Sequence, residues 1–181
     1  YGPSLQFYEG GVGLEVQGSP AYVPGVFGGA LTLGPSNYGG QDRVHNVVLD
    51  NLDQLVNTNR GTVEVWFRQV TDPVPFSHGI HRIFDGAFGL GSGISLYTSP
   101  RGVEFGVSFG GPGSMVTYPI TRFNGTWIHL AGVWDRAGIG GSNDKLRLYV
   151  NGQAVAFGTT ADWGSTVGSR ADIGGGNDGD I

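Results

Sequence analysis

The sequence predicts an all-β domain in which two antiparallel sheets pack face to face, and three observations lead to this fold class. Short runs of alternating apolar and polar residues recur along the chain. Clusters of Gly, Pro, Asn and Ser separate these runs, and Gly alone accounts for 35 of the 181 residues. No window of about twelve residues has apolar positions at helical spacing without an interrupting Gly or Pro. We therefore expect one two-sheet sandwich over residues 1–181.

The strands follow from the alternation of side chains. In Gly61–Val70, the residues Glu64, Trp66 and Arg68 share one face, and apolar residues share the other. Thr126–Asp135 is apolar on both faces, which predicts a central strand covered on both sides. The remaining predicted strands are Leu5–Tyr8, Ala30–Leu33, Arg43–Leu49, His81–Phe84, Ile94–Tyr97, Gly102–Phe109, Ser114–Tyr118, Asp144–Val150 and Gln153–Phe157.

Two further local signals complete the predicted architecture. Asn151-Gly152 lies between two apolar runs, and both residue types tolerate the positive φ angles of a type I′ hairpin turn. Asp50–Asn59 can form one short helical turn, with Leu52, Leu55 and Val56 facing inward.

Composition excludes several classes of function. Charged residues make up 14% of the chain and the net charge is −5, so the sequence lacks the basic stripe that a nucleic-acid partner requires. It contains no run of 18 apolar residues, so we expect no membrane span. Cysteine is absent, which excludes disulfides and thiolate metal sites. A chain that begins at Tyr1 is either a mature product whose export signal has been removed or a fragment, and of the two we expect the secreted product, which works outside the cell.

Several motifs occur in the order that a known family uses. GTWIHLAGVWD followed by a Gly-rich loop and DKLRLYVNGQAVA, within Gly125–Ala156, resembles the signature of laminin-G-like domains. VPGVFGGALTL, GTVEVWFR and ADIGGGNDGD resemble three further motifs of the same family. The chain is therefore similar to the LamG-like, concanavalin A-like lectin–glucanase domains. The resemblance implies an all-β, two-sheet antiparallel jelly-roll β-sandwich.

One departure from the family concerns the last strand. Members of the family continue past the I-G-G loop into a final strand that pairs next to the first one, whereas this sequence ends at Ile181. The resemblance thus implies an empty position in one sheet. A piece of chain missing from this sequence or a strand from another subunit could fill it, since exposed strand edges accept other strands. The candidate donor segment is Leu5, Gln6, Phe7 and Tyr8, whose residues alternate as a donated strand requires.

Enzymatic activity is not expected. Glycoside hydrolysis needs two carboxylates that flank one bond. The four glutamates, Glu9, Glu15, Glu64 and Glu104, provide no pair at close spacing on one strand.

Calcium is the one cofactor that the sequence suggests. The resemblance implies that Glu9 could be a structural Ca²⁺ ligand near the sheet edge. The tail residues Asn177, Asp178 and Asp180 supply the oxygen ligands that a hard cation prefers, although a solvated turn has the same composition.

Binding of a glycan would require an exposed aromatic platform with polar groups beside it. The candidates are Trp66, Tyr149 and Trp163, with Arg68 and Arg147 on the face of Trp66 and Tyr149. Asn124 stands in the only N-glycosylation sequon.

Two hypotheses of function remain open. The first is an extracellular structural or adhesive subunit that self-associates into a fibre or sheath by strand complementation between subunits. The second is a carbohydrate- or matrix-binding module of a larger secreted protein.

Overall fold

Thirteen strands in three sheets dominate the computed structural model, which describes residues 14–17, 21–33, 46–68, 81–86, 93–120 and 125–174. The strands are β1 Leu14–Gln17, β2 Ala21–Gly25, β3 Gly28–Thr32, β4 Asn46–Asp50, β5 Arg60–Phe67, β6 His81–Asp85, β7 Ile94–Ser99, β8 Gly102–Val107, β9 Ser114–Tyr118, β10 Ile128–Asp135, β11 Leu146–Val150, β12 Gln153–Gly158 and β13 Arg170–Ile173. One helical turn, α1 (Leu52–Leu55), and one 3₁₀ turn, η1 (Ile139–Gly141), accompany them.

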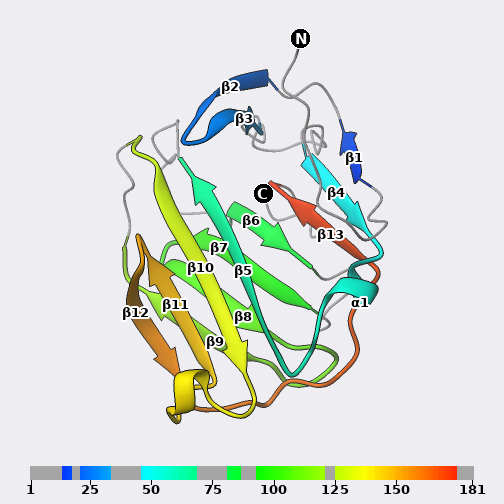
Figure 1. Ribbon diagram of the computed structural model, residues 1–181, viewed down its shortest axis with the longest axis vertical. Helices are drawn as coiled ribbons and strands as arrows, with labels where there is room; N and C mark the ends of the chain where they lie inside the picture. Colours follow the sequence, from blue (N-terminus) through cyan, green and yellow to red (C-terminus); the bar gives the residue numbers. More distant parts are fainter. Residues whose placement is uncertain are drawn as a thin grey trace.

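The strands form the predicted antiparallel sandwich. A seven-stranded sheet has the order β1-β4-β13-β6-β7-β8-β9, and a four-stranded sheet has the order β12-β11-β10-β5. Figure 1 shows the four-stranded sheet in front of the seven-stranded one, with the separate β2–β3 hairpin beyond the upper end of β5. The predicted fold class is confirmed.

The core lies between the two sheets. Leu96 and Phe105 from the large sheet meet Leu130 and Leu148 from the small one, and all four side chains are inaccessible to solvent. Each contributes about 1.5–3 kcal/mol by leaving water. Gly132 on β10 leaves the space that the Phe105 ring occupies. These contacts fix the two sheets against each other.

Several strand predictions hold in detail. β5 alternates between exposed and half-buried residues as expected. β10 lies between β5 and β11, so the predicted central position is confirmed, and on its far face Ala131 is buried whereas Val133 is half-buried. Asn151 and Gly152 have φ angles of 50° and 79°, as a type I′ turn requires.

One expectation about burial is wrong, and one carboxylate away from the core is also buried. Leu55 was expected to face inward from the helical turn, but it is exposed, because α1 is a single turn that buries Leu52 alone. Glu104 lies on the face of β8 opposite the core, yet only 2% of it is exposed. The hydroxyls of Ser99 and Tyr97 on β7 donate hydrogen bonds to its carboxylate, which makes that burial possible.

The strand that begins the I-G-G motif is paired on both sides among the described residues. β13, which begins that motif, pairs with β4 on one side and with β6 on the other, and both neighbours come from this chain. Among the described residues, the edges of the two large sheets are β1 and β9, and β12 and β5. An accepting edge must therefore be sought at one of these strands.

Candidate functional site

The polar face of β5 lies on the side of the four-stranded sheet that is turned away from the core, here called the outer face. Trp66 points to this face, and 40% of it is exposed. Its direct cross-strand partner on β10 is His129. The next pair along these strands, Val65 and Leu130, turns inward, so Trp66 and His129 both turn outward. The outer face therefore presents a tryptophan and a histidine side by side.

The Trp66 and His129 rings are in contact, with 5.2 Å between their centroids. His129 Nε2 also lies 3.6 Å from Glu64 Oε2, and the Glu64 side chain is 67% exposed. Glu64 precedes Trp66 by two residues, so it projects from the same face of β5. A flat aromatic surface is thus bordered by a carboxylate and an imidazole, both of which can form hydrogen bonds.

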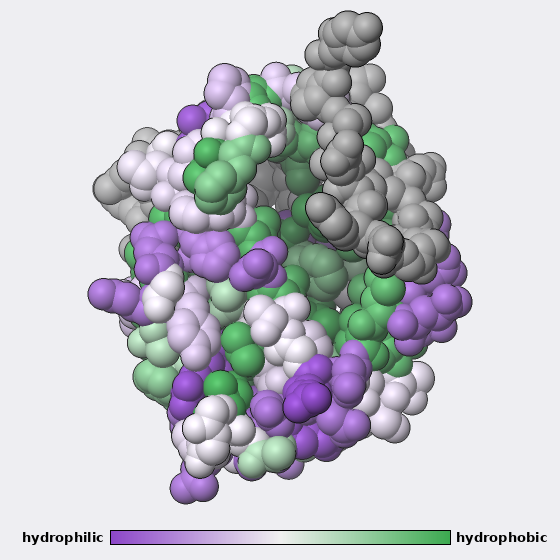
Figure 2. Space-filling model, in the orientation of Figure 1, coloured by the Kyte–Doolittle hydropathy of each residue, from purple (hydrophilic) through white to green (hydrophobic). Residues whose placement is uncertain are grey.

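A second aromatic ring comes from the tip of the β2–β3 hairpin. Phe27 is 82% exposed, and its centroid lies 5.9 Å from that of Trp66 with the ring planes 77° apart. Gly28, at φ 92°, provides the left-handed residue that closes this tight turn. Figure 2 shows the hydrophobic tip of the hairpin next to the upper end of β5. We call Phe27, Glu64, Trp66 and His129 the Trp66 cluster.

Arg68, predicted on the face of Trp66, stacks on another ring. Its guanidinium carbon lies 5.1 Å from the centroid of the Trp127 ring, a cation–π contact. Arg68 thus flanks the Trp66 cluster, and its charge is engaged with Trp127.

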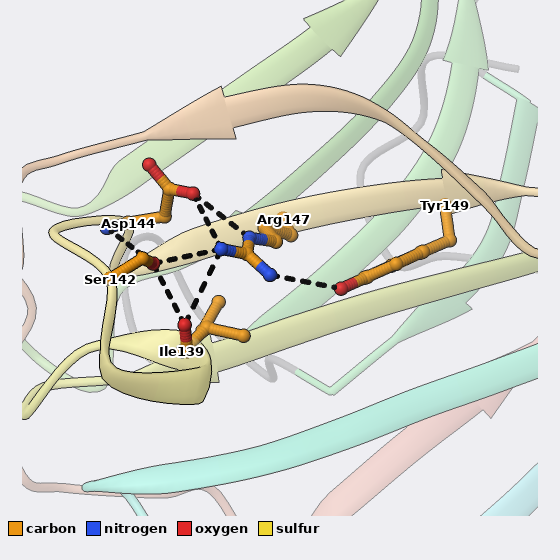
Figure 3. Close-up of polar contacts among 5 residues, drawn as sticks. All are labelled: Ile139, Ser142, Asp144, Arg147 and Tyr149. Carbon is orange, nitrogen blue, oxygen red and sulfur yellow. Dashed lines mark hydrogen bonds and ion pairs between the residues drawn. The ribbon is translucent and has the colours of Figure 1, made fainter.

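Arg147 and Tyr149 lie on β11, separated from Trp66 by β10. The Arg147 guanidinium lies 2.8 Å from Asp144 Oδ2, 2.8 Å from Ser142 Oγ and 3.5 Å from the Tyr149 hydroxyl. Figure 3 shows these groups around it. Its hydrogen bonds to Tyr149 and Asp144 raise the pKa of Arg147, so the side chain stays charged. Arg147 therefore ties the turn around η1 to β11, and its donors are occupied by the protein.

Trp163 is not an exposed platform, so this part of the sequence prediction is wrong. The residue is 4% exposed and belongs to the core. Its indole N–H donates to the Thr58 carbonyl at 2.9 Å, and the Arg136 guanidinium lies 5.0 Å from the ring centroid. The ring has packing partners on its faces and no surface for a saccharide.

Other predicted site residues lie outside the described part of the chain. They are Glu9, Asn177, Asp178 and Asp180 for calcium, Leu5, Gln6, Phe7 and Tyr8 for strand donation, and Asn124 for glycosylation. Within the described ranges, no group of three or more His, Asp or Glu side chains could hold a metal ion. The calcium site, the donor strand and the sequon stay predictions.

One pair of carboxylates does come together, on the seven-stranded sheet. Asp85 on β6 and Asp172 on β13 are direct cross-strand partners, and both are buried. Arg82 forms an ion pair with Asp85 at 2.5 Å, and the Asn46 amide donates to Asp172 at 2.9 Å. Each carboxylate has a partner in the protein, as buried charges require. This arrangement supports a structural role for the pair.

Sequence reasoning missed two members of the Trp66 cluster. Phe27 was read as part of a strand motif, whereas a large aromatic residue between Gly25 and Gly28 is a sign of an exposed turn. His129 lies on β10, where the alternation of the strand turns it outward beside the inward Leu130. His129 could have been found by following the strand period strictly, and Phe27 by its place between glycines.

Comparison with known proteins agrees with this architecture. The model of the laminin G family, described as the concanavalin A-like lectin/glucanases superfamily, matches residues 39–180. No curated protein shows significant sequence similarity to the chain.

In the described part of the chain, no helix has the length and apolar character needed to cross a bilayer.

The solved structures that are similar include binding domains of bacterial neurotoxins. The receptor-binding domain of botulinum neurotoxin D superposes with a TM-score of 0.68 at 11% identity, over 92% of this chain and 40% of that one. The serotype G binding domain gives 0.67 at 12% identity, over 90% and 38%. At such identities the likeness establishes the fold alone, and this chain spans about two fifths of the length of those proteins.

Proposed function

Because the chain belongs to the laminin G family of the concanavalin A-like lectin/glucanases superfamily, we propose that it is an extracellular recognition module that binds a saccharide at the Trp66 cluster. The observation that carries the proposal is the exposure of Trp66 and Phe27 side by side on the outer face, with Glu64 and His129 next to them. Aromatic faces pack against the C–H surface of a sugar ring, and neighbouring polar groups fix its hydroxyls.

The exposure of the aromatic side chains agrees with a binding surface at the Trp66 cluster. Large aromatic side chains are usually buried, and an exposed group of them marks a place where a ligand can exclude water. The similar structures include the receptor-binding domain of botulinum neurotoxin D and the binding domain of botulinum neurotoxin DC in complex with SialylT. These activities belong to the toxins, and they support a binding role for this fold without identifying the ligand of this chain.

A glycan array tests the proposal. We expect the wild-type protein to bind a defined subset of saccharides and Trp66→Ala to lose that binding. Phe157→Ala is the matched control, because Phe157 is an exposed aromatic residue at the far strand of the same sheet, against Arg147. An array without binding, or equal binding by Trp66→Ala, would refute the proposal.

A second candidate function is self-assembly by strand addition, and burial at β5 favours it. Among the described residues, β5 pairs with β10 alone. Its inward residues Val63 and Val65 are only partly buried, whereas Leu130 and Leu148 on the next strands are fully buried. Figure 2 shows hydrophobic residues in the hollow between β5 and the part of the large sheet that holds β4 and β13. An added strand at β5 would cover this surface.

Light scattering and electron microscopy test self-assembly directly. We expect the native protein to form oligomers or filaments in a concentration-dependent manner. Deletion of residues 1–9, which removes the proposed donor segment, should abolish them, and a synthetic peptide of the sequence YGPSLQFYE should cap them. A stable monomer at high protein concentration would rule out this second function.

Calcium binding remains a proposal based on Glu9, Asn177, Asp178 and Asp180. A bound structural ion would raise the melting temperature, so chelation should lower it. An unchanged melting temperature in the presence of a chelator would contradict the proposal.

A further inference from the structure

Three aromatic rings in the described part of the chain have an arginine over one face, and the exposed Trp66 ring is not one of them. Arg68 lies over Trp127, Arg136 over Trp163 and Arg147 over Phe157, at 5.0 to 5.9 Å from the ring centroids. Among the described residues, no cation of the chain lies over Trp66, although 40% of this residue is exposed. Tryptophan is the side chain that attracts a cation most strongly through its π face. The ring is therefore available to a cation that a ligand brings.

The second wall of the site suits the same chemistry. Phe27 and Trp66 meet at 77°, so they form two sides of a corner. Two or more aromatic faces that surround a position are the arrangement by which proteins bind organic ammonium groups. Phe27 is 82% exposed, so its ring is accessible to a ligand entering this corner.

Glu64 supplies the charge that such a ligand needs. It lies two residues before Trp66 on the same face, which places the two Cα atoms about 7 Å apart along the strand. Its side chain is 67% exposed, and its neighbour His129 is a cation only when protonated. The fixed cation nearby, Arg68, stacks on Trp127 on the other side of Trp66 along β5. The chain also carries a net charge of −5, which favours cationic over anionic ligands on approach.

We propose that the Trp66 cluster selects a ligand with an organic ammonium group, such as a saccharide with a free amine, and that Glu64 is the residue that makes this selection. This inference rests on the proposed saccharide-binding function. The ammonium group lies in the corner between Trp66 and Phe27, and the Glu64 carboxylate balances its charge. An anionic saccharide is repelled by the same carboxylate.

Calorimetry with matched ligands tests the inference. The probes are a glucosamine oligosaccharide, its N-acetylated counterpart of equal length, tetramethylammonium and the neutral tert-butyl alcohol. We expect the amine-bearing and ammonium probes to bind about tenfold more tightly than their neutral partners. Glu64→Gln should remove most of that preference, and Trp66→Ala or Phe27→Ala should weaken binding of both amine and ammonium. Asp53→Asn is the control, since it removes one exposed carboxylate of α1 and should change nothing.

The outcomes separate the inference from the proposed function. Competition of tetramethylammonium with the amine saccharide would show that the ammonium group suffices for binding. Tight binding of the amine saccharide without such competition would show that the sugar ring is also needed. Both outcomes support selection of the ammonium group. Equal affinity for the free-amine and N-acetylated saccharides, unchanged in Glu64→Gln, would overturn the inference and leave saccharide binding intact. Failure of every saccharide to bind the wild-type protein would overturn both.

Discussion

Trp66 on β5 and His129 on β10 are direct cross-strand partners, and their ring centroids lie 5.2 Å apart on the outer face of the small sheet. The register that pairs them also turns Val65 and Leu130 into the core. A slip by one residue would exchange the two faces of the strand, so the core itself fixes the position of the site. The platform is thus formed before any ligand arrives, which limits the entropic cost of binding.

The β11–β12 turn supports His129 from the other side. Asn151 Oδ1 accepts a hydrogen bond from the His129 amide at 2.9 Å, and Asn151 itself has a φ of 50°. We expect Asn151→Ala to destabilise the protein by about 1–2 kcal/mol, because it loses this bond and strains the turn. Asn151→Gly should cost less, since it keeps the positive φ. Urea denaturation measures both variants, and equal losses for the two would contradict the role of φ.

Arg136 holds the segment that crosses the lower end of the sandwich. Its guanidinium donates to the carbonyls of Ala161, Trp163 and Gly164, and it stacks on the Trp163 ring. We expect Arg136→Ala to lower the free energy of unfolding by about 2–3 kcal/mol, because three carbonyls lose a charged donor. Arg136→Lys should restore little, since an ammonium cannot reproduce the planar fork.

The exposed Arg101 provides the control for this measurement. Arg101→Ala should leave the midpoint of chemical denaturation unchanged. A loss in Arg136→Ala no larger than that of the control would show that the guanidinium is dispensable.

Gly132 lets the two sheets approach each other. A Cβ at this position would lie 2.2 Å from Cδ2 of Phe105, which has no room to move in the core. We expect Gly132→Ala to destabilise by about 1–3 kcal/mol or more through overpacking. Gly106→Ala, where the nearest atom is Ser95 Oγ at 3.3 Å, should cost less in thermal denaturation. The opposite order of the two melting temperatures would contradict the packing described here.

The Tyr97 hydroxyl should lose its proton at a higher pH than that of a free tyrosine. Burial raises its pKa from 10.0 to about 12, and the charge of Glu104 and the hydrogen bond to it act in the same direction. The unfolded chain loses this proton near pH 10.0, whereas the folded protein keeps it to about 12. The associated stabilisation is therefore present below pH 10 and is lost as the pH rises from there toward 12.

The difference in ultraviolet absorbance between wild-type protein and Tyr97→Phe isolates this titration. Glu104→Gln should lower the pKa of Tyr97, because it removes the negative charge, while burial keeps it above the value for a free tyrosine. Titration of Tyr97 near pH 10, the value of a free tyrosine, would contradict the buried network.

The period of the strands made much of the fold predictable. Alternation in β5 placed Trp66 outward, and the positive φ of Asn151 follows from the Asn-Gly pair. Alternation alone could not show that Glu104 is buried, because that depends on hydroxyls from a neighbouring strand. It could not place Trp163 either, since this residue follows the last alternating run and reaches the core through a loop. The neighbours of β13 likewise come from distant parts of the chain.

The most direct test of ligand binding at Trp66 uses the indole N–H resonances of the four tryptophans. The indole N–H groups of Trp134 and Trp163 donate hydrogen bonds to the carbonyls of Asn57 and Thr58, in or near the core. Their resonances are therefore internal controls. On titration with a saccharide selected from the array, the Trp66 resonance should shift with saturation while these two stay unchanged. Saturable shifts elsewhere with an unmoved Trp66 resonance would contradict the central claim.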